Sequence, residues 1–493
     1  MANVASGSVS GNLSACGTQQ YKINLTAGTL YDFNVAGSYS GGGTLVNPVL
    51  TLLNADLATV ETDDDVTTFT TQTNTVFDPR IGYTATYTGT YYLRVSSSFL
   101  GGAGTYTLSQ SNQTVSSLIP DLLYLQEFPT FRWNFGQAIG TPVARTYAFQ
   151  TDASVAAFYG FSGFTELNSD QKQTIRKILG IYSAIANITF TEVSDQSAGQ
   201  LRFGMADLPP LTIGRGVDQE QYNADNTARY QDVFLDKTLY SGTLDGSQSV
   251  EDWFHEVGHA LGLKHPGNYS GNTGVGDQPF MPLTFDNTKF SVMSYIRDPD
   301  NPWGGTSHST PALLDIAAVQ YLYGANISAK GQTHTFTVSS SVPFVGSLIS
   351  SGANDTIDAG NQKLGTSINL TAGTFSSIGV KLGGTAAHDN VAIPFGATVF
   401  DAIGGAGNDI IIGNELDNVI TGGPGDDTID GGGGINTAVY TGIRANFTIK
   451  KTASGFTVTD NTGAEGTDTL INIQLIKFFD TPSSLDINAL ATQ

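Results

Sequence analysis

Three histidines and a glutamate fall within one short segment, His255-Glu256-Val257-Gly258-His259-Ala260-Leu261-Gly262-Leu263-Lys264-His265. On a helix, residues four apart share a face, so His255 and His259 can present their imidazoles to one point. Glycine at position 262 suits the left-handed turn that ends a helix, and this turn would bring His265 back as a third ligand. Three imidazoles bind zinc and leave its fourth position open for water, which is the arrangement of a catalytic site.

Glu256 follows the first histidine and can reach a zinc-bound water without binding the metal itself. Zinc lowers the pKa of that water toward ~7, and the glutamate can accept its proton as the water attacks a carbonyl. A helix that carries ordinary surface histidines is the simpler alternative. Three of the six histidines of the chain lie in this one segment, with a glutamate and a glycine at the required places, which argues against that alternative.

The segment matches the metzincin motif H-E-x-x-H-x-x-G-x-x-H followed by a Met-turn, which here is Ser291-Val-Met293-Ser-Tyr295. Within the metzincins the chain resembles the serralysins. Pro266-Gly267 follows the third histidine, residues 311–324 resemble the helix that closes the serralysin catalytic domain, and glycine-rich repeats come after it. The resemblance implies that Met293 lies beneath the zinc as a hydrophobic floor, and that Tyr295 contacts the metal at rest and stabilises the oxyanion.

Nine-residue repeats occupy residues 404–439, each a glycine-rich turn of six residues followed by a three-residue strand. This periodicity predicts a parallel β-roll. The middle residue of each strand is expected to point inward; these residues are Ile411, Ile420, Ile429 and Ala438. A disordered glycine-rich linker is the alternative, and the fixed period with its inward isoleucines argues against it.

Two repeats should make one turn of the roll, so a repeat stacks on the one two further along. Asp409 and Asp427 would then share a calcium ion with turn carbonyls, because calcium takes six to eight oxygen ligands. The turn residues concerned are Gly404, Ala406, Gly422 and Pro424. The intervening repeats carry Asn418 and Asn436, which are neutral, so stronger calcium binding is expected on the aspartate side. Gly352–Asp358 resembles an outlying calcium loop of the family, with Asp355 as the expected ligand.

The chain of 493 residues is expected to be a multidomain α+β protein. Residues 1–112 predict a β-sandwich and resemble the bacterial pre-peptidase C-terminal domain. Residues 113–330 predict a metzincin-type α/β zinc protease domain. Residues 331–493 predict the calcium-binding β-roll and a C-terminal segment of the secretion type. The elements expected in the middle region are helices at 169–186, with Ser169 as N-cap, at 249–261 and at 311–323, and strands at 188–193 and 200–204.

The net charge of −22 argues against nucleic acid as a partner, and no apolar run of about 18 residues predicts a membrane span. The single cysteine, Cys16, excludes an intramolecular disulfide. The N-terminus shows no cleavable signal. The resemblance to the serralysins and the glycine-rich repeats imply export by a type I secretion system to the extracellular space. The absence of a visible N-terminal signal agrees with this route. We expect a monomer.

The sequence therefore predicts a secreted, Zn²⁺-dependent and Ca²⁺-binding endopeptidase that acts on proteins or peptides. Two alternatives stay open. One is a surface-layer or adhesion protein that binds calcium and carries a vestigial protease domain. The other is a dedicated processing protease for one partner protein.

Overall fold

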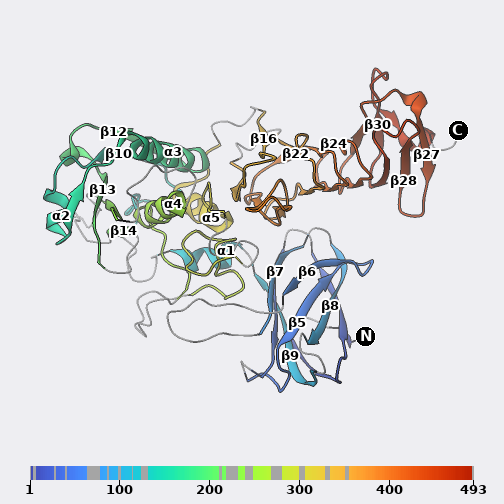
Figure 1. Ribbon diagram of the computed structural model, residues 1–493, viewed down its shortest axis with the longest axis horizontal. Coiled ribbons are helices and arrows are strands. Elements are labelled where there is room, and N and C mark those ends of the chain that lie inside the picture. The colour runs from blue at the N-terminus through green and yellow to red at the C-terminus, as the bar shows by residue number, and fades with distance from the viewer. Residues whose placement is uncertain are drawn as a thin grey trace.

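The structure is a computed structural model, mostly β with few helices (Figure 1). It describes the chain apart from residues 1, 4–6, 27–28, 39–40, 64–77, 86–87, 98–101, 114, 124–131, 210–213, 218–230, 239–247, 268–279, 299–305, 328–332, 350–354 and 491–493. None of the helices in the described part has the length and apolar character needed to cross a membrane. Gly352–Asn354 of the expected outlying calcium loop lie outside the described residues.

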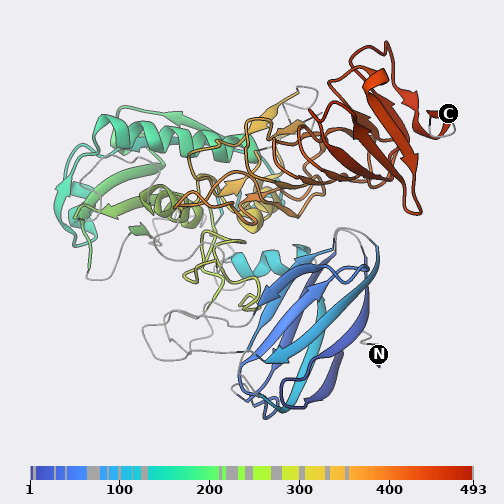
Figure 2. The ribbon, with the colours of Figure 1, turned by 45° about the vertical axis from the view of Figure 1, so that its right-hand side comes forward.

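The N-terminal part is two sheets packed face to face, drawn in blue in Figures 1 and 2. Alternation along the strands places one face of each sheet inside; on β8, Tyr91, Leu93 and Val95 are fully buried. The strands of the first sheet are, in order, β1 (Ala2–Asn3), β3 (Gln19–Leu25), β8 (Gly89–Ser97), β5 (Pro48–Leu53) and β6 (Thr59–Asp63). The strands of the second sheet are, in order, β2 (Gly7–Leu13), β9 (Gly104–Gln113), β4 (Leu30–Ala36) and β7 (Arg80–Thr84).

The central part contains a six-stranded sheet whose edge strand β14 runs antiparallel to its neighbour β15. The strands are β12 (Ile188–Glu192), β10 (Val143–Phe149), β13 (Leu201–Asp207), β15 (Gln231–Asp236) and β14 (Gly214–Val217), with β11 (Ser162–Thr165) paired to β13. The helical elements are α1 (Val115–Leu118), η1 (Ile119–Leu122), α2 (Ser154–Phe158), α3 (Ser169–Ile185), η2 (Gln196–Ala198), α4 (Gln248–Ala260) and α5 (Leu313–Tyr323).

Helix α3 confirms the predicted helix and corrects its cap. The N-cap is Asn168, whose side chain accepts hydrogen bonds from the backbone N–H groups of Asp170 and Gln171. The Gln171 side chain in turn accepts the Asn168 backbone N–H, which completes a capping box. Ser169 was the wrong choice by one residue, because only Asn168 has a glutamine three positions ahead.

Helix α5 is buried on nearly all sides, as its sequence Leu-Leu-Asp-Ile-Ala-Ala-Val requires. It begins at Leu313, two residues later than predicted, and ends before Gly324, whose φ of 81° is accessible to glycine. Its apolar residues belong to the core of the central part, and that core also includes Ala392 of the C-terminal part.

The C-terminal part holds two sheets of mainly parallel strands that share one core. Strands pair with strands two repeats away, so Ile411 lies beside Ile429 and Ile420 beside Ala438. All four side chains are buried, as the repeat pattern predicts. The first sheet is β16 (Thr335–Thr337), β18 (Asp355–Asp358), β22 (Val399–Ile403), β24 (Val419–Thr421), β26 (Thr437–Val439), β30 (Leu475–Lys477) and β31 (Leu485–Asp486); the second is β19 (Ser367–Asn369), β23 (Ile410–Ile412), β25 (Thr428–Asp430), β29 (Thr467–Ile471), β28 (Phe456–Asp460) and β27 (Phe447–Lys451).

Smaller elements complete this part of the chain: a three-stranded sheet, a 3-10 turn and a terminal helix. They are β17 (Gly346–Ser347), β21 (Val391–Ala392) and β20 (Phe375–Ser376), then η4 (Arg444–Asn446) and α6 (Ile487–Leu490).

The N-terminal sheets dock on the segment that precedes the Met-turn. Thr284 donates a hydrogen bond from its hydroxyl to the Asp32 carboxylate. Gly82 of β7 lies close to the same segment: a Cβ atom at this position would be 2.7 Å from Thr284 Cγ2 and 2.8 Å from Phe285 Cε1. Phe285 is fully buried, so its ring has little room to move away. Only glycine fits this contact.

Replacing Gly82 with valine should therefore push the N-terminal part away from Phe285. We expect the overpacking to weaken docking by roughly 1–3 kcal/mol. In differential scanning calorimetry, weaker docking should appear as a first unfolding transition at a lower temperature than in the wild type. In limited proteolysis it should appear as faster cleavage between the N-terminal and central parts. Lys22→Val, on an exposed position of β3, is the control. Equal behaviour of the two variants would show that the contact does not hold the parts together.

Candidate active site

Helix α4 carries two of the three histidines, and its observed bounds confirm the predicted helix within one residue. Phe254, Val257 and Leu261 are fully buried and attach the segment to the central core. His255 and His259 are four residues apart on another side of the helix, with ring centroids 4.8 Å apart. The apolar residues thus fix which way the imidazoles point.

The chain leaves α4 through a Schellman turn. Gly262 has φ 102°, its N–H bonds to the His259 carbonyl, and the Leu263 N–H bonds back to the Gly258 carbonyl. Leu263 then forms a bridge with Leu123, which fixes the returning chain. The turn brings His265 opposite the helix, as predicted from the glycine.

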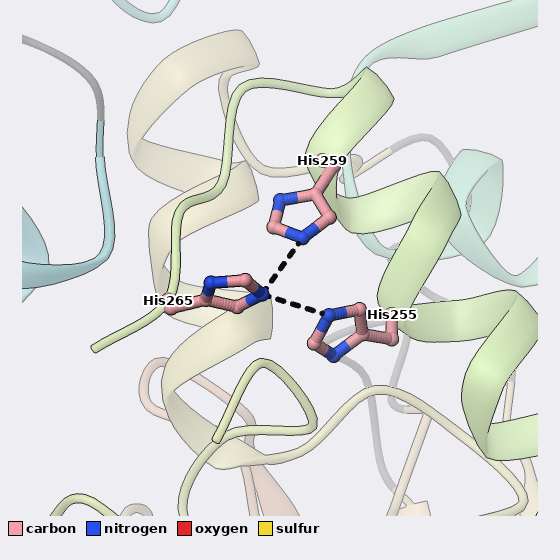
Figure 3. Close-up of side chains that lie close together, drawn as sticks. All are labelled: His255, His259 and His265. Carbon is pink, nitrogen blue, oxygen red and sulfur yellow. Dashed lines mark hydrogen bonds between the residues drawn. The ribbon is translucent and has the colours of Figure 1, made fainter. Parts of the chain in front are cut away.

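The three imidazoles face one another (Figure 3). Nε2 of His265 lies 3.1 Å from Nε2 of His255 and 3.1 Å from Nε2 of His259. Nδ1 of His255 lies 2.8 Å from the Val292 carbonyl oxygen, and Nδ1 of His259 lies 2.9 Å from the Leu263 carbonyl oxygen. Both Nδ1 atoms therefore carry the proton, and both Nε2 atoms present a lone pair.

A metal ion is what these lone pairs fit. One proton on His265 Nε2 could bond to only one of the two facing nitrogens at a time. Zinc at 2.0–2.1 Å from each nitrogen would set tetrahedral N–N separations of about 3.3 Å, close to those observed. Among the described residues, these three histidines are the one group of three or more His, Cys, Asp or Glu side chains whose ligand atoms lie within 4.8 Å of one another.

Burial also keeps the imidazoles neutral, which is the state that binds a metal. Burial lowers the pKa of His255 to about 3 and the pKa of His259 to about 4. Burial, and then the neighbouring histidines, lower the pKa of His265 well below its usual value. All three rings are uncharged at neutral pH.

Glu256 lies next to the cluster and is nearly buried, with 6% of its surface exposed. Edge strand β14 passes directly beside it: a Cβ on Gly214 would be 2.6 Å from Glu256 Oε1. The missing side chain at Gly214 leaves space for the carboxylate. Nothing in the sequence around Gly214 indicates this role, because it depends on the contact with Glu256, which lies 42 positions further along the chain.

Tyr295 stands at the open side of the cluster, with 49% of its surface exposed. Its ring centroid lies 4.5 Å from that of His265 and 5.8 Å from that of His255. Burial, and then the charge of Glu256, raise the pKa of Tyr295 to about 12. The phenol is therefore protonated at neutral pH and can donate a hydrogen bond.

Met293 is fully buried against α4. A Cβ on Gly258 would lie 2.7 Å from Met293 Sδ, so only glycine at 258 allows the thioether this close to the helix. The Met-turn thereby packs against α4 at Gly258, and through the Val292 carbonyl it also orients His255.

Asp315 on α5 holds the Met-turn in place, a role the sequence reasoning missed. Its carboxylate accepts hydrogen bonds from the Ser291 hydroxyl at 2.6 Å, the Val292 N–H at 2.8 Å and the Ala312 N–H at 2.9 Å. Burial raises the pKa of Asp315 to about 6, and these hydrogen bonds oppose the rise. The signal that could have revealed this role is a single acidic residue inside an otherwise apolar helix.

A second buried acid, Glu251, ties the chain after the Met-turn to α4. It forms an ion pair with Arg297 and accepts the backbone N–H of His308 at 2.8 Å. Both ends of the segment that contains Met293 are thus anchored by carboxylates. The sequence reasoning missed this pair too, because the partners lie 46 positions apart.

The predicted calcium residues lie in the C-terminal part, all but Asp355 in turns between its strands, and the structure brings Asp409 and Asp427 together. The Asp409 N–H bonds to Asp427 Oδ1 at 2.8 Å, and both side chains are buried. Asp355 is buried at the start of β18, in the other sheet, 3.5 Å from the His334 ring. Of the predicted turn residues, Gly404 and Gly422 are buried, and Ala406 and Pro424 are exposed.

The sequence is 30% identical to serralysin G of Dickeya chrysanthemi over 347 residues, 65% of this chain and 67% of that protein. The chain belongs to the serralysin family. It is also 34% identical to metallopeptidase AprA of Pseudomonas marginalis, over 55% of this chain and 60% of that protein, and 33% identical to serralysin of Proteus mirabilis, over 58% and 62%. The chain thus spans about three fifths to two thirds of the length of these relatives.

Residues 312–463 match the family model described as Peptidase M10 serralysin C terminal. Among solved structures, the pre-peptidase C-terminal domain of a collagenase from Bacillus anthracis aligns with 22% of this chain and 93% of that domain, at 20% identity and a TM-score of 0.17.

Replacing Asp315 with alanine should loosen the Met-turn and with it His255. Three buried donors would lose their acceptor, and changes of this kind behind a metal ligand lower metal affinity by roughly 10–100-fold. Competition with a chromophoric chelator measures the zinc affinity.

Gln320→Ala is the matched control on the same helix, because it removes a hydrogen bond to the Ile185 carbonyl far from the Met-turn. It should change stability and leave zinc affinity unaltered. If both variants bind zinc as the wild type does, Asp315 does not position the site.

Proposed function

We propose that this protein is a secreted, zinc-dependent endopeptidase that hydrolyses peptide bonds of protein substrates. The observation that carries the proposal is the convergence of three neutral imidazoles beside a nearly buried glutamate. His255, His259 and His265 would hold the zinc. Bound zinc would supply a Lewis acid that polarises a carbonyl and makes water a nucleophile at neutral pH.

The residues of the chain supply the other steps. Glu256 accepts the proton of the attacking water and delivers it to the departing amine. Tyr295, protonated and half-exposed, donates a hydrogen bond to the carbonyl oxygen as negative charge develops on it. Met293 supports the helix that carries the first two histidines.

Strand β14 is suited to hold the substrate. It ends the described central sheet, so its outer edge offers backbone donors and acceptors to an extended peptide. Gly214 at its start lies against Glu256. A peptide paired with this edge would pass its scissile carbonyl in front of the carboxylate.

The C-terminal sheets support the rest of the proposal. We propose that they form a calcium-binding β-roll, with Asp409 and Asp427 among its ligands, and that the units are 1–112, 113–330 and 331–493. Export by a type I system, an extracellular location and a monomeric state belong to the same proposal. The roll would fold where calcium is plentiful.

Glu256→Gln tests the catalytic assignment, because it keeps the size of the side chain and removes its basicity. We expect hydrolysis of casein and of quenched peptides to fall roughly 10²–10⁴-fold, with zinc still bound. Glu166→Gln, an exposed position, is the control and should keep full activity. Equal digestion by the wild type and Glu256→Gln would favour the adhesion alternative, and cleavage of a single protein only would favour the dedicated processing protease.

A further inference from the structure

Residues 281–296 contact the N-terminal sheets as well as helix α4. Near the start of this segment, the Met281 N–H bonds to the Pro266 carbonyl at 2.8 Å, directly after His265. Near its end the segment carries Tyr295, whose ring centroid lies 4.5 Å from that of His265. The segment therefore reaches the site at both ends, and the contacts of its middle residues decide where Tyr295 stands.

A buried carboxylate joins the middle of the segment to the residue before Tyr295. The Ser294 hydroxyl donates a hydrogen bond to Asp286 Oδ1 at 2.7 Å and accepts the Ile296 N–H at 3.1 Å. Asp286 has 1% of its surface exposed, and Ser294 has 5%. This hydroxyl thus connects the residues on both sides of Tyr295, and it takes its orientation from Asp286.

The two residues before Asp286 are held by the N-terminal sheets. Thr284 donates a hydrogen bond from its hydroxyl to Asp32 of β4 at 2.5 Å. Phe285 is fully buried, and the missing side chain at Gly82 of β7 leaves the space that its ring occupies. Because both neighbours are fixed on another part of the molecule, the backbone at Asp286 has little freedom to move.

The N-terminal sheets also enter the core of the central part. Leu30, at the start of β4, is buried and belongs to the same hydrophobic core as Leu123. Leu123 forms the bridge with Leu263 that fixes the chain on its way to His265. Since β4 carries Asp32 as well, the strand that accepts the Thr284 hydroxyl is itself packed into the part that holds the site.

We propose that Asp286 is a positioning residue for Tyr295. The N-terminal sheets hold Asp286 in place through the hydrogen bond between Asp32 and Thr284. This inference rests on the proposed function, in which the Tyr295 phenol donates a hydrogen bond to the developing oxyanion. Such a donor is effective when it already stands where the charge develops. Tyr295 is half-exposed, so its backbone has to be held by the residues that flank it.

A double-mutant cycle with Tyr295→Phe tests this role. We expect Asp286→Ala to lower kcat for quenched peptides roughly tenfold and to leave KM unchanged, because the hydrogen bond affected forms in the transition state. In the Tyr295→Phe background the same change should have little effect, since no hydroxyl is left to position. Asp286→Asn keeps an oxygen for the Ser294 hydroxyl and should retain most of the wild-type kcat.

An equal loss of kcat in the wild-type and Tyr295→Phe backgrounds would show that Asp286 acts on stability alone and would overturn its positioning role. If Asp286→Ala does not fold, Ser294→Ala takes its place in the cycle, because it removes the donor of the same hydrogen bond.

Thr284→Val tests the contribution of the N-terminal sheets, because it removes the hydroxyl that bonds to Asp32 and keeps a side chain of similar size. We expect kcat to fall roughly threefold or more, and not to fall further in the Tyr295→Phe background. Thr448→Val on β27 is the matched control, since it loses a hydroxyl hydrogen bond to Asn461 Oδ1 in the C-terminal sheets. Equal kcat for the two valine variants would overturn the contribution of the N-terminal sheets.

Hydrogen exchange of the full chain distinguishes a failure of this inference from a failure of the proposed function. The Ile296 N–H bonds to the Ser294 hydroxyl, so its exchange reports on the turn without any catalysis. We expect this amide to exchange roughly tenfold faster in Asp286→Ala and in Thr284→Val than in the wild type and in Thr448→Val. Unchanged exchange would overturn the inference even in an active peptidase. Faster exchange in a chain that hydrolyses no protein would support the contacts and overturn the proposed function instead.

Discussion

The structure depends on one constraint: three imidazoles have to converge inside the protein, with Nε2 of His265 held 3.1 Å from the lone pairs of both His255 and His259, an arrangement that a cation between the rings would stabilise. Backbone carbonyls set the two helical rings by accepting their Nδ1 protons. One of these carbonyls belongs to Val292 and the other to Leu263, so both the Met-turn and the Schellman turn have to be in place before the rings converge. The geometry of the site is a property of the surrounding chain more than of α4.

The segment from Met281 to Ile296 links that site to the rest of the molecule. It meets the N-terminal sheets through Thr284 and the C-terminal part through Phe290, whose ring lies 5.5 Å from that of Phe375. Lys289 adds an ion pair with Asp389 at 2.6 Å. A chain segment that touches three parts and lies against α4 can transmit order among them. Under the proposed function, calcium-dependent folding of the C-terminal sheets would favour a complete active site.

Much of the local structure could be read from the sequence because short-range rules determine it. The spacing of His255 and His259, the glycine turn and the inward isoleucines follow from helix and strand periods. Asp315, Gly214 and Glu251 could not be assigned in the same way, since each acts through a contact with a distant segment. The pairing of β29 with β25 was hidden as well, because the hairpin of β27 and β28 interrupts the nine-residue period before the stack of strands resumes. The cap of α3 was misplaced by one residue for a different reason: the choice between Asn168 and Ser169 rests on the partner at Gln171.

X-ray absorption at the zinc edge of the metal-loaded chain tests the central claim most directly. The account predicts one zinc per chain with three imidazole nitrogens and at least one oxygen at about 2.0–2.1 Å. Fewer than three imidazoles around the metal, a sulfur ligand, or a purified chain that takes up no zinc would contradict it.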